Sequence, residues 1–130
     1  MSGLSKPRLK EIETLLSERE KTLQAEVRAA HEAEAARPSA QGPQVDDEVA
    51  QGEQRFRHGI EHAELQRDQE ELRDIDTARE RIAAGSYGQC VDCGMDIAFE
   101  RLKAQPTATR CVACQTRYER THDAAPRYTP

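Results

Sequence analysis

Four cysteines arranged as two pairs are the residues of this chain best suited to chemistry. The pairs Cys90–Cys93 and Cys111–Cys114 form the pattern C-x2-C-x17-C-x2-C. Two residues between the members of a pair allow a tight turn to aim both sulfurs at one ion, and the longer span allows the second pair to complete a tetrahedron. The spacing therefore predicts one zinc ion held by four thiolates. Because protein fills all four positions, we expect a structural rather than a catalytic zinc.

A redox pair of the C-x-x-C type is the alternative interpretation of these cysteines, and two such pairs at this spacing make it the weaker one. No segment resembles a signal peptide, and no run approaches the roughly 20 apolar residues that span a bilayer. We therefore expect a cytoplasmic protein with no membrane partner. In a reducing cytosol, paired cysteines favour metal over disulfides.

His58 and His62 are a second candidate metal pair, because their i,i+4 spacing places them on one face of a helix. They lack the H-E-x-x-H pattern of zinc enzymes, so solvated histidines are the favoured interpretation. We find no nucleophile–base signature and no glycine-rich phosphate loop. The sequence therefore predicts a protein that is not an enzyme.

The composition limits the size of the hydrophobic core. The 130 residues are 36% hydrophobic, 4% aromatic and 33% charged, with no Trp and a net charge of −5. Such a chain is either disordered or built from long helices with a narrow buried seam. A core this small needs additional stabilisation from a cross-link, which the predicted zinc supplies. The negative balance also argues against a protein built to neutralise nucleic-acid phosphates.

Apolar spacing predicts two long helices. The first runs from about Ser5 to Ala36, with Arg19 interrupting its apolar stripe, and the second from about Asp47 to Ala84, with Gly85 as its C-cap. The stripe of the first helix comprises Leu9, Ile12, Leu16, Leu23, Val27 and Ala30. The second helix carries one stripe of Val49, Phe56, Ile60 and Ala63 and another of Leu65, Leu72, Ile75 and Ile82.

Prolines at 38 and 43 separate these helices by a short segment, which predicts an antiparallel coiled-coil hairpin. A last short helix is expected from about Val112 to His122. The predicted fold is thus mainly α: a hairpin over residues 1–85 with its tip at about 37–48, a four-cysteine zinc finger with the short terminal helix over 86–123, and a flexible tail over 124–130.

The residues around the cysteines form a longer pattern. It reads Tyr87-Gly88-x-Cys90-x-x-Cys93-Gly94-x-x-Ile97, then Arg101-Leu102-x-Ala104-x-Pro106-x-Ala108-x-x-Cys111-x-x-Cys114-Gln115. Together with the upstream hairpin, it resembles the DksA/TraR family of bacterial transcription regulators over roughly residues 4–122. The resemblance implies a regulator that binds RNA polymerase through its secondary channel, without sequence-specific contact with DNA, and that modulates transcription initiation.

The hairpin tip departs from the family motif Asp-x-x-Asp-x-Ala, since this chain reads Gln44-Val-Asp-Asp47-x-Val49. Only Asp47 matches, and Asp46 stands beside it as a possible substitute. By resemblance, Asp46, Asp47 and Val49 are the residues expected to approach the polymerase active site.

The positions that hold the alarmone ppGpp in well-known family members are basic, and here they are Asp74, Gln105 and Gln115. A carboxylate cannot replace a phosphate-binding cation, and two neutral amides add no charge to offset it. We therefore expect a regulator that does not bind ppGpp at this site. We also expect the protein to be a monomer. Two alternatives remain open: an adaptor with a purely structural zinc, and a zinc-finger nucleic-acid-binding protein.

Overall fold

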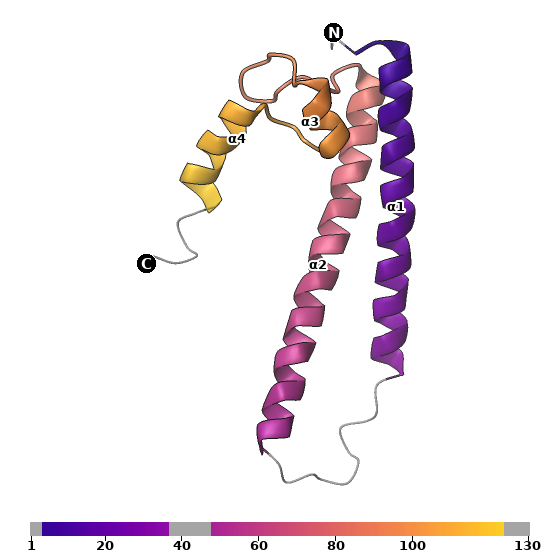
Figure 1. Ribbon diagram of the computed structural model, residues 1–130, viewed down its shortest axis with the longest axis vertical. Coiled ribbons are helices and arrows are strands. Elements are labelled where there is room, and N and C mark those ends of the chain that lie inside the picture. The colour runs from indigo at the N-terminus through magenta and orange to yellow at the C-terminus, as the bar shows by residue number, and fades with distance from the viewer. Residues whose placement is uncertain (1–3, 37–47, 124–130) are drawn as a thin grey trace. The chain divides into compact units, whose positions relative to one another are not determined.

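The computed structural model describes residues 4–36 and 48–123, which are mainly helical (Figure 1). Two long helices, α1 (Lys6–Ala35) and α2 (Glu48–Ala84), are followed by α3 (Phe99–Ala104), α4 (Val112–Tyr118) and a π-helical turn η1 (Glu119–Asp123). No strand forms in these ranges, and one isolated antiparallel bridge joins Gln89 to Asp96. The mainly α fold predicted from the sequence is confirmed.

The start of α1 follows from a side-chain cap. The Ser5 hydroxyl oxygen accepts a hydrogen bond from the Arg8 N–H at 3.3 Å, and the Ser5 carbonyl accepts one from the Leu9 N–H at 2.9 Å. Pro7 fits this first turn because its missing N–H would have no partner there. Within α1, the predicted stripe is buried at Ile12, Leu16 and Leu23.

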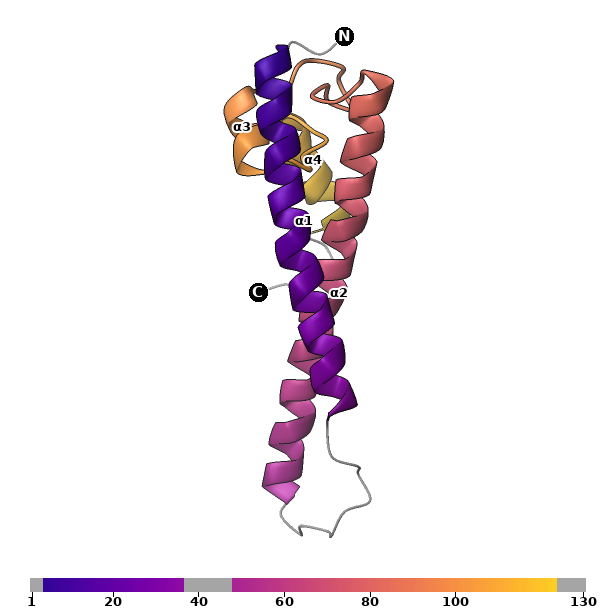
Figure 2. The same cartoon turned by 90° about the vertical axis from the view of Figure 1, so that its right-hand side faces the viewer.

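The chain divides into two compact units, the first formed by Met1–Glu18 with Asp74–Pro130 and the second by Arg19–Arg73. Each unit contains a segment of α1 and a segment of α2, which run in opposite directions (Figure 2). Almost all of the core lies in the first unit, where Ile12, Leu16, Ile75, Ala78, Tyr87, Cys90, Ile97, Leu102, Ala108 and Cys114 are buried. Among the described residues, Leu23 is the one buried hydrophobic side chain of the second unit.

The two apolar stripes predicted for α2 have different outcomes. The stripe of Leu65, Leu72, Ile75 and Ile82 is buried or half-buried, as expected. The other stripe is exposed where its side chains are described, with Phe56 70% and Ile60 44% exposed, so its prediction as a packing face is wrong. For Phe56 the physical reason is the length of α1, which ends at Ala35 and whose Glu34 lies beside His58, so that Phe56 lies past the end of its partner helix.

The connection out of α2 depends on a glycine. Gly85 has a φ of +80°, in the left-handed region that side chains with a Cβ avoid. This conformation turns the chain back, so that the Ser86 N–H donates to the Arg81 carbonyl at 2.9 Å. The predicted C-cap is confirmed, and the turn leads directly into the cysteine-rich segment.

The C-terminal part differs from the prediction in two details. The six-residue helix α3, which buries Leu102 completely, was not predicted. The helix expected over Val112–His122 instead ends as α-helix at Tyr118 and continues as the π-helical turn η1, in which the Tyr118 and His122 rings stack with centroids 4.2 Å apart. Over the described ranges, no helix has both the length and the apolar character needed to cross a bilayer.

Candidate metal centre

The four cysteine sulfurs converge on one point in the first unit. All four Sγ atoms lie within 4.8 Å of one another, and those of Cys93 and Cys111 are 3.9 Å apart. A zinc ion bound to four thiolates at about 2.3 Å requires sulfurs about 3.8 Å apart at the corners of a tetrahedron. The spacing of the sulfurs therefore fits the group that the sequence predicts.

The first cysteine pair is shaped by a tight turn of backbone. Its Gly94 N–H donates to the Cys90 carbonyl at 2.9 Å, and the Cys93 N–H points at the Cys90 sulfur at 3.5 Å. Gly94 has a φ of +78°, which a residue with a Cβ adopts only with strain. The turn is closed by the Cys90 N–H, which donates to the Met95 carbonyl at 2.8 Å.

The second cysteine pair is placed by the start of α4. Cys111 is the extended residue that precedes the helix, and Cys114 lies in its first turn, where it is buried. Flanking residues join the two loops: the Val91 N–H donates to the Thr109 carbonyl at 2.9 Å, and the Arg110 guanidinium donates to Asp92 at 2.8 Å. The two loops thus hold each other in place around the sulfurs.

Two of the thiols at this centre, Cys90 and Cys114, have pKa values shifted in opposite directions. Burial opposes ionisation of Cys90, but backbone N–H groups, including that of Cys93, outweigh it and lower its pKa to about 6. Hydrogen bonding to the Cys111 sulfur, then burial, raises the pKa of Cys114 to about 12. The neighbouring sulfurs and burial therefore oppose ionisation of Cys114, and a dication at the centre would stabilise its thiolate.

Hydrogen bonds from Tyr87 and Arg81 hold the finger loops in place. The buried Tyr87 hydroxyl donates to the Pro106 carbonyl at 2.7 Å, and Arg81 donates to the carbonyls of Ser86 and Gln89. These contacts connect the end of α2 to the finger loops on both sides. The sequence did not predict this role of Arg81. Its hydrogen bonds go to backbone carbonyls, which every residue has, so no pattern of side chains indicates them.

The other residues singled out in the sequence are not part of this centre. Asp46 and Asp47 lie outside the described residues, and Val49 is in the first turn of α2. His58 and His62 lie on α2 in the second unit, where His58 Nδ1 is 3.8 Å from a carboxylate oxygen of Glu34.

Fold and centre together define a helical-hairpin protein with a four-cysteine structural zinc finger. Residues 85–120 match the family model of the prokaryotic dksA/traR C4-type zinc finger. The structure also matches that of transcription factor DksA2 from Pseudomonas aeruginosa with a TM-score of 0.72 and 30% identity, over 90% of this chain and 87% of that one. The chain belongs to the DksA/TraR family.

Further relatives support this assignment. The solution structure of DnaK suppressor protein from Agrobacterium tumefaciens is 31% identical, with a TM-score of 0.55, and the match covers 90% of this chain and 99% of that one. The RNA polymerase-binding transcription factor DksA of Caulobacter vibrioides is 50% identical over 46 residues, 35% of this chain and 32% of its own. Its Escherichia coli counterpart is 30% identical over 78 residues, 60% of this chain and 50% of its own. The matched regions thus span a third to a half of these curated relatives.

Proposed function

We propose that this protein is a non-enzymatic transcription regulator that binds RNA polymerase through its secondary channel and modulates initiation. The observation that carries the proposal is the structural match to DksA2 over 90% of this chain. The finger match supports it, because relatives that share the finger are named RNA polymerase-binding transcription factors.

In this proposal the parts of the chain have separate roles. Residues 1–85 form the hairpin that enters the channel, with Asp46, Asp47 and Val49 at its tip. Residues 86–123 form the zinc-bound base, in which Cys90, Cys93, Cys111 and Cys114 are the ligands. The zinc supplies folding energy to this base, since a four-thiolate site leaves no position open for water or substrate.

The regulator acts without ppGpp at the family's usual site. Asp74 and Gln105 are exposed, and the Gln115 amide donates to the Glu119 carboxylate at 2.8 Å. None of these three side chains brings a positive charge to a phosphate, and Gln115 is already held by an anion. Adding ppGpp should therefore leave the affinity for polymerase and the effect on transcription unchanged.

The binding experiment uses the zinc-loaded full chain and purified bacterial RNA polymerase. We expect binding that an established secondary-channel factor displaces. No binding at micromolar protein would contradict the proposal. Binding that the competitor leaves intact would favour an adaptor, and salt-sensitive binding to duplex DNA alone would favour a nucleic-acid-binding finger.

Transcription from a ribosomal RNA promoter tests the tip. The Asp47→Asn variant should still bind polymerase but lose its effect on transcription, because the substitution removes one charge and little volume. Asp76→Asn, a change at an exposed acid on α2, is the matched control and should behave like the parent protein. Equal activity of both variants would show that the Asp47 carboxylate is not required.

A further inference from the structure

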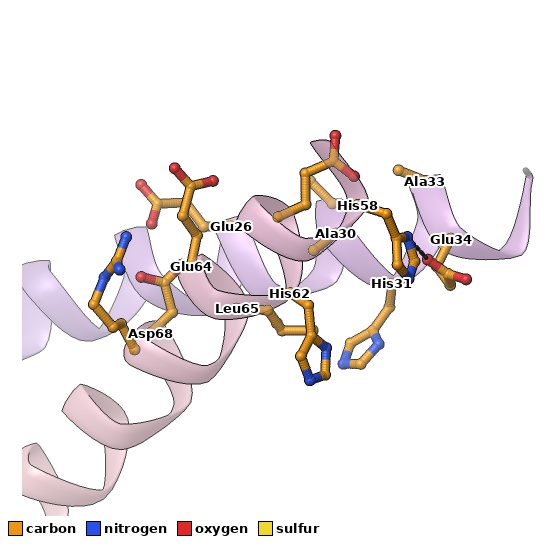
Figure 3. Close-up of a pocket in the computed structure, with 13 residues that line it drawn as sticks. Glu26, Ala30, His31, Ala33, Glu34, His58, His62, Glu64, Leu65 and Asp68 are labelled. Carbon is orange, nitrogen blue, oxygen red and sulfur yellow. Dashed lines mark ion pairs between the residues drawn. The ribbon is translucent and has the colours of Figure 1, made fainter. Parts of the chain in front are cut away.

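Three histidines gather around one groove of the second unit. His31 on α1 and His58 and His62 on α2 line a groove of about 810 Å³ between these helices (Figure 3). The chain has four histidines, and the fourth, His122, lies in η1. The sequence indicated only the pair on α2, because His31 becomes its neighbour only when the helices align.

Each helix presents two donor groups to the groove. His58 and His62 are one helical turn apart on α2, and His31 and Glu34 are three residues apart on α1, so each pair shares a helix face. A carboxylate oxygen of Glu34 lies 3.8 Å from His58 Nδ1. The rings of His31 and His62 point toward one another across the groove (Figure 3).

The charge around the groove favours a cation. Within the described residues, Arg67 is the one arginine or lysine of the lining, against the carboxylates of Glu26, Glu34, Glu61, Glu64 and Asp68. The hydrogen bond and charge of Asp68 raise the pKa of the Glu26 carboxyl, which shows that the two acids are close enough to disfavour a second negative charge. The groove as a whole therefore carries more negative than positive side chains, which favours a cation over an anion.

We propose that this groove binds one divalent transition-metal ion of the zinc class through His31, His58 and His62, with Glu34 as the carboxylate ligand. Imidazole and carboxylate are the ligand types that such ions prefer where no thiolate is present. The ion would join α1 to α2 in the unit where Leu23 is the one buried hydrophobic side chain among the described residues.

The site closes by rotation of side chains. Among the described residues, only the cysteine sulfurs already lie as close together as a metal shell requires. The side chains of His58 and Glu34 are 48% and 59% exposed, which leaves them room to change rotamer. Because binding must order these side chains, we expect micromolar affinity, far weaker than that of the finger.

The test uses the full-length protein with its finger already loaded with zinc. After equilibrium dialysis against micromolar free zinc, elemental analysis should find two equivalents per chain. The double variant His31→Asn/His62→Asn should retain the finger zinc and lose the second equivalent. His122→Asn removes the histidine outside the groove and should keep both. One equivalent in the parent protein, or two in the double variant, would overturn the proposal.

Cobalt identifies the ligands of the second ion. Added to the zinc-loaded protein, Co²⁺ should give the weak visible bands of nitrogen and oxygen coordination, and these bands should be absent from the double variant. Intense thiolate-to-cobalt absorption with release of zinc would instead show exchange at the finger and would contradict a separate site. Circular dichroism should show that the variants keep the parent helicity, since the replaced side chains are exposed.

Discussion

Arg19 and Glu71 form a two-pronged ion pair between α1 and α2. Arg19 Nε donates to one carboxylate oxygen at 2.7 Å and a terminal guanidinium nitrogen donates to the other at 2.9 Å. Arg19 is the residue that interrupts the apolar stripe of α1. The planar guanidinium group of Arg19 presents two N–H donors that match the two oxygens of a carboxylate. This polar residue in the stripe therefore adds a directional contact between the helices, where an apolar side chain would contribute only packing.

This ion pair should make a small and pH-dependent contribution to stability. The hydrogen bond from Arg19 lowers the pKa of the Glu71 carboxyl. A carboxyl with a lowered folded-state pKa stabilises the fold above its unfolded pKa, and this contribution disappears as the pH falls through the folded value. Because both side chains are partly exposed, a double-mutant cycle of Arg19→Gln and Glu71→Gln should give a coupling of about 0.2–1 kcal/mol at neutral pH.

The carboxyl carbon of Glu71, followed by NMR through an acid titration, checks the pairing directly. Arg19→Gln should return its pKa toward the ordinary glutamate value. Arg73→Gln is the control, since residues two apart on a helix do not share a face. An unchanged titration in Arg19→Gln would mean that the pair does not form in solution.

Loss of one cysteine should release the zinc and unfold the finger. Cys93→Ser removes an exposed ligand with little change in volume, so lost binding rather than lost packing should dominate. Tightly bound zinc, measured after dialysis against buffer without free zinc, should fall from about one equivalent to near zero, while the helical circular dichroism of α1 and α2 largely remains. Met95→Ala, at a 67% exposed residue of the same loop, should keep its zinc. A Cys93→Ser variant with full zinc content would rule out this cysteine as a ligand.

Tyr87→Phe should lower the free energy of unfolding by about 1 kcal/mol, because it leaves the Pro106 carbonyl without its donor. Tyr118→Phe is the control, since its half-exposed ring keeps its stacking on His122. Denaturant unfolding of the zinc-loaded proteins measures both. If Tyr87→Phe were as stable as the parent protein, the Pro106 carbonyl would have to accept a hydrogen bond from water in the variant.

Ionisation of Tyr87 should destabilise the fold at alkaline pH. Burial raises the pKa of its hydroxyl above that of an ordinary tyrosine. A raised folded-state pKa gives stability that is present below the unfolded value and is lost as the pH rises past it. Phenolate absorbance should therefore show one tyrosine that titrates late or only on unfolding, and Tyr87→Phe should remove that step.

Two glycine substitutions should act in opposite directions. Gly59→Ala places a methyl group in open space within α2 and should raise stability by up to about 1 kcal/mol. Gly85→Ala also meets no atom within 4 Å, but its φ of +80° makes the substitution cost about 1–2 kcal/mol. The melting temperatures of both variants show whether the backbone conformation or the space around the new methyl group determines the effect of the substitution. If Gly59→Ala lowered the stability, Gly59 would be needed for a bend in α2.

The sequence predicted those features that depend on local chemistry. Prolines 38 and 43 and the left-handed Gly85 marked where the long helices end, and the cysteine spacing indicated a single cluster. The finger helix α3 was missed because six residues carry too little periodicity, and its position depends on burial of Leu102 in contacts distant along the chain. The same limit hid the pairing of Arg19 with Glu71 and the position of His31 on the same groove as His62.

The uneven distribution of buried side chains implies that the two units open with different free energies. Local unfolding of Arg19–Arg73 exposes little apolar surface, whereas opening of the unit around the finger exposes most of the core. Amide hydrogens of the former should exchange with solvent well before those near Ile75, Tyr87 and Leu102. A partner that captures the Arg19–Arg73 unit would therefore meet a segment that samples open forms while the zinc-bound end keeps its structure.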